Sequence, residues 1–356
     1  MLTKKIFSIL VFTFLITPFA VFAEGAHTEL SELSESEKKA AQKEYIDHHL
    51  QDSYDFGIWH AYGIEFPLPV ILIDEGLHVF MSSEFHHGES VVESNGKYYK
   101  VFHSKIYRTD AEGTINMDES THHPSNVKPL DLSITKNVFT IILISILIFW
   151  LFKSVAKSYA NSMIPSKKGR LLEPLVLFVR DEIAIPNIGE KYYGKYMSYL
   201  LTVFFFIWFL NLAGMTPLGI GVTNNIAVTF GLAIMTFLIT QFTAKKDYWG
   251  HIFWMPGVPV FMKVVLAPIE LLGVFIKPFA LMIRLYANMT AGHVVMMSLI
   301  ALLYLFENWL ARGAFLGLTL FLSILELLVA FLQAYIFTML TALYFGAAVA
   351  EHDDHH

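Results

Sequence analysis

The chain of 356 residues has no cysteine, so it can form neither disulfide bonds nor thiolate metal sites. It also lacks a glycine-rich phosphate loop of the Walker type, and the sequence contains no recognisable nucleotide site. An internal repeat of the inverted kind, which many secondary transporters have, is missing as well. These absences argue against a disulfide-stabilised protein, a P-loop nucleotide hydrolase and a transporter built from inverted halves.

What the chain has in abundance is apolar side chains. Hydrophobic residues make up 55% of the sequence, and the mean hydropathy is +0.51, which is typical of a membrane protein. The net charge of −6 is unevenly distributed. Residues 24–131 carry 20 acidic and 8 basic side chains, whereas residues 153–195 carry 8 basic and 4 acidic ones. The two regions are therefore expected to lie in different environments.

The first 23 residues have the features of a secretory signal peptide. Lys4 and Lys5 precede the apolar stretch "IFSILVFTFLITPFAVF", and "VFA" offers small residues for cleavage before Glu24. The alternative is a first membrane helix that stays in the mature chain. The apolar core is short and contains Pro18, which favours the signal peptide.

Residues 24–131 are then expected to be an exported, periplasmic domain with some β-structure. The segment 31–46 indicates an exposed helix, and the apolar runs 67–74, 77–85 and 97–108 indicate strands separated by turns such as "ESNGK". Ten of the 15 histidines lie in this region, so a zinc or copper site is an alternative to consider. Adjacent histidines on a strand point to opposite faces, which favours plain surface residues.

The remainder, residues 132–350, is expected to be an all-α membrane domain of about five helices. The first span, 137–152, is followed by a basic loop, and basic loops stay in the cytoplasm, so the N-terminal domain lies outside. The tail 351–356 is then cytoplasmic. A mixed apolar and charged segment at 171–186 indicates an amphipathic helix along the membrane surface. The further spans are expected at 196–214, 226–244, 264–305 and 314–350, with a single charged link at 307–313 between the last two.

The first of the two long helices carries a polar stripe. Glu270, Lys277, Arg284 and Asn288 are separated by 7, 7 and 4 residues, which places them on one face of an α-helix. Ionisable groups inside a membrane indicate function by default. The stripe can line an ion path or hold helices together, and Glu270 and Lys277 are equally well explained as structural residues near the interface.

His293 is expected on another face of the same helix. It lies five residues after Asn288 and is rotated from the stripe by about 140°. The following helix contains one acid, Glu326, with Gln333 two turns further along the same face. Antiparallel packing would bring His293 near Glu326, and such a pair can share and pass a proton near neutral pH. Arg284 does not titrate and cannot belong to this relay.

At these residues the sequence resembles subunit a of F-type ATP synthases, the stator half of the membrane motor. The resemblance covers roughly residues 137–350 and is densest at "PIELLGVFIKPFALMIRLYANMTAGH" (268–293) and "LELLVAFLQAYIFTMLTALY" (325–344), with "NLAGMTP" (211–217) also similar. It implies that Arg284 is the essential arginine facing a ring of c subunits. It also implies that the long helices are strongly tilted along that ring. The acidic region 24–131 is not part of the common core of the family.

The resemblance assigns the other polar residues as well. Asn288, His293, Glu326 and Gln333 match polar residues of a half-channel open to the outside, and Glu270 matches a carboxylate assigned to the proton path in some members. In well-known bacterial members an acid occupies the position of His293 and a histidine that of Glu326, so the pair is exchanged here.

The function implied is proton translocation in the membrane sector of a bacterial ATP synthase of the inner membrane. The implied partners are the c ring, the b-subunit peripheral stalk, the remaining synthase subunits and lipid, with no cofactor, no nucleic acid and no catalysis in this chain. A self-contained ion channel or antiporter is the alternative, and a purely structural membrane anchor is the simplest one.

Overall fold

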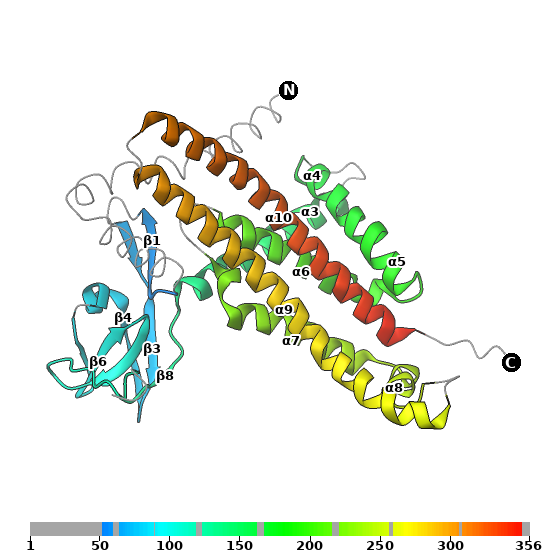
Figure 1. Ribbon diagram of the computed structural model, residues 1–356, viewed down its shortest axis with the longest axis horizontal. Helices are drawn as coiled ribbons and strands as arrows, with labels where there is room; N and C mark the ends of the chain where they lie inside the picture. The colour runs from blue at the N-terminus through cyan, green and yellow to red at the C-terminus, as the bar shows by residue number, and fades with distance from the viewer. Residues whose placement is uncertain are drawn as a thin grey trace. The chain divides into compact units, whose positions relative to one another are not determined.

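The protein is described by a computed structural model over residues 52–59, 64–88, 90–118, 123–161, 167–215, 221–255, 259–305 and 308–350 (Figure 1). The expected signal peptide, the expected helix at 31–46 and the tail 351–356 lie outside the described residues. The chain divides into two compact units, residues 1–142 with 213–220 and residues 143–212 with 221–356. Each unit has its own hydrophobic core.

The first unit is built from short antiparallel strands. The strands are β1 (Asp55–Trp59), β2 (Ile64–Pro67), β3 (Pro69–Ile73), β4 (Leu77–Met81), β5 (Val92–Ser94), β6 (Lys97–Phe102), β7 (Lys105–Thr109) and β8 (Leu130–Asp131), with a 3-10 helix η3 (Ser82–Gly88) after β4. They pair as β1-β2, as β4-β3-β8 and as β5-β6-β7. The expected β-rich domain is therefore confirmed, with two differences in detail.

The first difference is that the run 97–108, expected as one strand, is a hairpin of β6 and β7. His103 and Ser104 form its two-residue turn with φ of 46° and 58°, the left-handed geometry that such turns require. The second difference lies in the run 77–85, where the strand ends at Met81 and the 3-10 helix follows. At the expected "ESNGK" turn, Asn95 and Gly96 have φ of 51° and 76°, as predicted for an Asn-Gly hairpin.

Apolar side chains from both three-stranded sheets form one core. The fully buried members include Leu72 of β3, Tyr99 of β6 and Ile106 of β7, and the ring of Phe80 from β4 stacks on that of Tyr99. Among the described residues, no group of three His, Cys, Asp or Glu side chains is arranged to hold a metal ion. The alternative of a metal site at the histidines therefore has no geometric support in this part of the chain.

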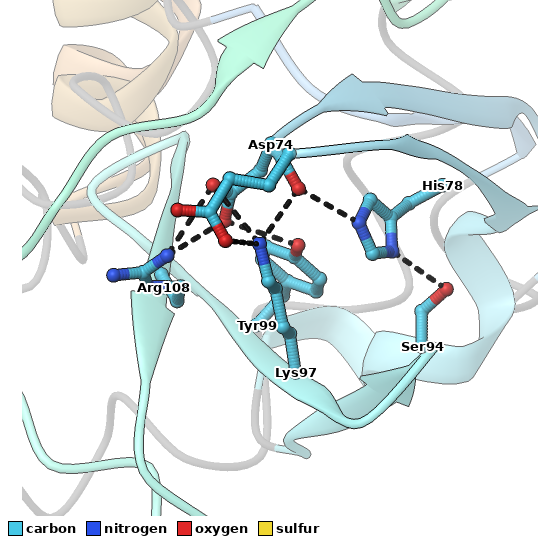
Figure 2. A network of polar contacts seen from close by, with 7 residues as sticks. Asp74, His78, Ser94, Lys97, Tyr99 and Arg108 are labelled. Atoms are coloured by element: carbon cyan, nitrogen blue, oxygen red, sulfur yellow. Dashed lines mark hydrogen bonds and ion pairs between the residues drawn. The ribbon is translucent and has the colours of Figure 1, made fainter.

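A network of polar contacts centred on Asp74 joins the two sheets (Figure 2). The Asp74 carboxylate lies 3.3 Å from both Lys97 Nζ and Arg108 Nη1, and it accepts a hydrogen bond from the Tyr99 hydroxyl. Burial opposes the charged carboxylate, but the hydrogen bond from Lys97 and the charges of Arg108 and Lys97 outweigh it, so the pKa of Asp74 lies below its ordinary value. Burial and the nearby Asp74 charge raise the pKa of Tyr99 to about 12.

The second unit consists of helices. They are α3 (Lys136–Asn161), whose first turns belong to the first unit, α4 (Lys167–Phe178), the π-helix η4 (Val179–Ala184), α5 (Ile185–Ile188), α6 (Tyr193–Gly214), the 3-10 helix η5 (Val222–Asn224), α7 (Ile226–Thr243), α8 (Lys246–Phe253), α9 (Val260–Leu305) and α10 (Trp309–Val349). Five of these, α3, α6, α7, α9 and α10, are long and apolar enough to cross a membrane. The expected all-α membrane domain with five spanning helices is confirmed.

Three details of the helical unit differ from expectation. The segment 171–186 is helical as expected, but a π-helical turn joins α4 to α5. The short helix α8 was not predicted. The link before the last helix is shorter than expected, because α10 already begins at Trp309, where the Asn308 side chain accepts a hydrogen bond from the Leu310 amide.

The two longest helices, α9 and α10, run side by side along the unit (Figure 1). With 46 and 41 residues, they are about 69 Å and 62 Å long, against about 30 Å of hydrocarbon in a bilayer. The backbone of α10 also approaches α5 closely at Gly346, where a side-chain carbon would collide with the Asn187 carbonyl oxygen. This glycine allows α10 to pack directly against the backbone of α5.

Candidate functional site

An ionisable pair is buried between α9 and α10. His293 Nδ1 lies 3.3 Å from Glu326 Oε1 and 3.2 Å from the carbonyl oxygen of Met289. Both side chains are almost fully buried, at 6% and 8% exposed. Glu326 Oε1 accepts no well-aligned hydrogen bond from any described residue, so it retains a site for a proton or a water molecule. The expected approach of His293 to Glu326 is confirmed.

The pair has room because a glycine precedes His293. A side-chain carbon on Gly292 would lie 3.2 Å from Glu326 Oε1, closer than an ordinary contact. The absence of that carbon leaves the carboxylate free to change position.

Glu326 belongs to a line of buried polar residues on α10. Thr319, Ser323, Glu326 and Gln333 are all buried, and their spacing of 4, 3 and 7 residues keeps them on one helix face. The Ser323 hydroxyl donates to the carbonyl oxygen of Thr319 and lies 3.5 Å from Met296 Sδ. The sequence indicated Glu326 and Gln333 but missed the two hydroxyl residues, because single Ser and Thr residues are common in membrane helices.

A residue of α6 completes this line. Asn211 is fully buried, and its Nδ2 donates to the Ala330 carbonyl oxygen, which lies between Glu326 and Gln333 along α10. Its Oδ1 finds no partner among the described residues. The available signal was an amide side chain inside an otherwise apolar helix, a position that rarely occurs without a role.

The stripe on α9 has the opposite placement. Lys277, Arg284 and Asn288 are exposed at the surface of the unit, and Glu270 is half-buried. Arg284 and His293 are nine residues apart, which corresponds to a rotation of about 180° on an α-helix. The structure therefore puts Asn288 with Arg284 on the outer face, apart from the buried His293, Glu326 and Gln333, with which the resemblance grouped it.

A small cavity that is partly open to the surface of the unit lies between α7, α8, α9 and α10. Its polar lining residues are Thr236, Thr240, Gln241, Tyr248, Lys277 and Tyr344. Lys277 Nζ lies 5.7 Å from the centre of the Tyr344 ring. This cavity was not predicted, because residues from four separate helices form it.

The two polar regions lie on opposite sides of Arg284 along α9. Lys277, in the cavity, precedes it by seven residues, or about 10 Å, and His293 follows it by nine residues, or about 14 Å. The buried His293–Glu326 pair thus lies on one side of Arg284 along α9, and the polar cavity beside Lys277 lies on the other. This arrangement can pass protons in two separate stages but not in one step past the guanidinium.

Comparison with known proteins gives two family matches. Residues 138–346 match the model of the ATP synthase A chain, and residues 45–132 match a model described only as a domain of unknown function. The boundary between the two matches falls at the start of α3.

Several similar proteins carry the name ATP synthase subunit a. A protein of Chlorobaculum tepidum named ATP synthase subunit a 2 is 44% identical over 239 residues, which cover 64% of this chain and 67% of the relative. The ATP synthase subunit a of Chlorobium phaeobacteroides is 38% identical over 298 residues, covering 79% and 84%. That of Myxococcus xanthus is 42% identical over 235 residues, covering 64% and 77%.

Proposed function

We propose, because this chain belongs to the ATP synthase A chain family, that its residues form two proton half-channels separated by Arg284. Proton translocation as the stator of the membrane motor is the role of this family. The observation that carries the assignment of residues is the opposite placement of charges on α9. The His293–Glu326 pair is buried inside the unit, whereas Arg284 is exposed on its surface.

The entry path follows the buried polar line of α10. Glu326 takes up a proton and exchanges it with His293, whose Nδ1 lies 3.3 Å away. Gln333 and Asn211 supply amide groups that can hold water along the next two turns. Proton exchange between a carboxyl group and an imidazole in a low-dielectric setting is favourable because each partner stabilises the charged form of the other.

Arg284 faces the partner that receives the proton. A guanidinium cannot lose its proton in a protein, and at a bilayer centre it costs about 2.5–3.5 kcal/mol on insertion scales. Because Arg284 is exposed on α9, an anion from outside this chain must offset that cost. We assign that anion to a carboxylate of a c subunit, which Asn288 helps to orient. Once protonated, the carboxyl group can enter lipid without the cost of a buried charge.

The exit path is the cavity beside Lys277 and Tyr344. It lies toward the N-terminal end of α9 and next to α8, which follows the basic residues Lys245 and Lys246. Basic loops stay in the cytoplasm, so this cavity opens to the cytoplasmic side. Glu270, half-buried two turns before Lys277, is assigned to the part of this path nearest the cytoplasm.

The proposed topology follows from the same rule. The N-terminal domain is periplasmic after removal of a signal peptide, and the C-terminus is cytoplasmic. The chain is non-catalytic, and it contacts the c ring through α9 and α10 and the b-subunit stalk elsewhere.

The length of α9 supports a strong tilt, because an upright helix of about 69 Å would extend far beyond a bilayer of about 30 Å hydrocarbon thickness. Each proton moving down 100 mV releases about 2.3 kcal/mol for rotation.

The assignment is tested by replacing Arg284 with Ala in the assembled synthase, reconstituted in proteoliposomes with an imposed proton gradient. ATP synthesis should fall to background, because without the guanidinium nothing attracts the ring carboxylate and nothing blocks direct passage of protons between the two half-channels. Assembly should remain normal, because Arg284 contributes to the surface and not to the core. Ile276→Ala, at a 60% exposed position on the same helix, is the matched control. Near-normal synthesis with Arg284→Ala would refute the assignment.

A further inference from the structure

One face of the β4-β3-β8 sheet is apolar throughout. Alternate residues of β3 and β4 point outward, and these are Ile71, Ile73, Leu77, Val79 and Met81, joined by Leu130 of β8. Cross-strand pairing places Ile71 opposite Val79, and Ile73 between Leu77 and Leu130. We call this surface the apolar sheet face.

The apolar sheet face is open in the structure. Leu77 is 63% exposed, Leu130 is 60% exposed and Val79 is 57% exposed. The opposite faces of the same strands, which include Val70, Leu72 and Phe80, already form the core of the unit. A contiguous apolar patch without any charged residue marks an interaction surface in proteins that are stable in water.

This sheet continues without a linker into the first membrane helix. The Leu132 amide donates to the Ile71 carbonyl oxygen, and the Ile134 amide donates to that of Pro69, so strand-like pairing extends almost to Lys136, where α3 begins. In the first turn of α3, Phe139 packs its ring against that of Phe56 in β1, with 5.0 Å between the centroids. The sheet and the start of α3 therefore belong to one unit.

The few residues between the β4-β3-β8 sheet and α3 limit how far the apolar sheet face can lie from the membrane. Leu132 precedes Lys136 by four residues, which span at most about 14 Å when fully extended. Val138 and Ile142 of α3 are exposed apolar residues of a helix that crosses the membrane. The headgroup layer adds about 5–7 Å to each side of the hydrocarbon. The sheet is thus held at the height of the headgroups.

The outward face of the other three-stranded sheet, β5-β6-β7, is more polar. It carries Glu93, Tyr98, Lys100, Phe102, Lys105 and Tyr107, of which Glu93 and Lys105 are exposed and the others half-buried. The two sheets therefore differ, with charged side chains on one outward face and apolar side chains on the other. Amphipathic elements with this division lie in the membrane interface with their apolar side toward the acyl chains.

We infer that the apolar sheet face binds the surface of the lipid bilayer, with its side chains at the boundary between headgroups and acyl chains. The bilayer is favoured over a protein partner because the covalent connection to α3 holds the face beside lipid. The inference does not depend on the proposed proton path, and it holds on whichever side of the membrane the domain lies.

The test uses nitroxide labels, for which the absence of cysteine makes the full chain well suited. Val79→Cys and Leu130→Cys report on the apolar sheet face from two strands, and Lys105→Cys on the outer face of the other sheet is the matched control. Each labelled full-length chain is reconstituted in phosphatidylcholine vesicles. Collision rates are then measured with oxygen, which concentrates in lipid, and with a water-soluble nickel complex.

The ratio of oxygen to nickel collisions should be several-fold higher at residues 79 and 130 than at residue 105. Equal ratios at all three positions would show that water covers the face and would overturn the inference. Low collision rates with both reagents at residues 79 and 130 would show that protein covers it, and this result would overturn the inference as well. All three substitutions are at exposed side chains, so correct folding is expected.

Discussion

Two ionisable groups on one helix have opposite environments, and this difference is the basis of the different roles that we propose for them. Arg284 is exposed on α9, and His293, half a rotation away, is buried against Glu326. A permanent cation can attract a carboxylate but cannot carry a proton, whereas an imidazole beside a carboxyl group can. The spacing of nine residues thus places two groups on different faces of α9: the group proposed to attract a carboxylate and the group proposed to transfer a proton.

Exchange of the buried pair tests the local relay. His293→Ala should slow proton-driven synthesis by about 100-fold, because a positioned acid–base group contributes roughly that factor or more to a proton transfer. The double variant His293→Glu with Glu326→His should recover part of the loss, since both groups remain within contact distance. The measurement is the rate of ATP synthesis by the reconstituted synthase under an imposed proton gradient. If the exchanged variant is as slow as the single one, the two residues do not form a relay.

The Asp74 network predicts that the folding stability of the N-terminal domain falls at acid pH. The pKa of Asp74 is lowered in the folded state, so its stabilising contribution is complete above the unfolded pKa near 3.9 and is lost as the pH falls through the lower folded value. Asp74→Asn should remove this dependence and destabilise the sheets by about 2 kcal/mol, because Lys97 and Arg108 lose their partner.

Hydrogen exchange of β3 and β6 in the full-length chain, followed from about pH 5 down to about pH 2, measures this effect. Glu112→Gln, at an exposed side chain, is the control and should exchange as the unchanged protein does. Identical protection in Asp74→Asn and the unchanged chain would show that the network adds no stability.

Part of the site could be predicted from residues alone. Arg284, His293 and Glu326 were identified because charges stand out in apolar helices, and helical rotation gave the facing of His293. Asn211 and Ser323 were missed, because a single amide or hydroxyl has several ordinary explanations in such a helix. The cavity could not be predicted, since it depends on how four helices pack and not on any one pattern.

At the scale of elements, long apolar runs predicted all five spanning helices, because hydrocarbon leaves a segment of that length few alternatives. The turns and short elements between these helices and strands were predicted less completely. The His103–Ser104 turn was missed because neither residue is the Asn or Gly that such turns favour. The helix α8 was missed because its eight residues are too few for a periodic pattern to be distinct.

The contact between α10 and α5 gives a prediction for one glycine. Gly346→Ala places a methyl group against the Asn187 carbonyl oxygen, and because that oxygen belongs to the backbone, α10 must move away. The cost should be about 2 kcal/mol, as for other overpacked sites. The measurement is thermal unfolding of the purified subunit in detergent. Gly317→Ala on the same helix, where no atom lies within 4 Å of the added carbon, should leave the unfolding temperature unchanged or raised. Equal behaviour of both variants would contradict the close packing.

At the scale of the molecule, the chain joins two units with different chemistry. The helical unit corresponds to the ATP synthase A chain match at 138–346, and the strands correspond to the separate match at 45–132. The helical unit alone contains both polar regions and Arg284. The proton path that we propose therefore lies in the helical unit.

The dependence on a partner separates this function from that of a self-contained channel. The full chain reconstituted alone in liposomes should conduct no protons, because the proposed path from His293 leads to the exposed Arg284, which cannot take up a proton, and continues only through a carboxylate of the c ring. Addition of the c ring should create a proton leak, and the rate of this leak should change in the Arg284→Gln variant. The measurement is the decay of a pH gradient across the vesicle membrane. Steady conduction by the chain alone would favour the channel.

The unbroken passage from sheet to helix has a consequence for any attempt to shorten the chain. The first amides of α3 are not satisfied by α3 itself: Lys136 donates to the Ser53 carbonyl oxygen and Asn137 donates to Asp52 Oδ1. A truncated subunit that starts near residue 132 would leave these two amides without acceptors. A minimal version must therefore include a new capping residue, such as an aspartate or serine, directly before the helix.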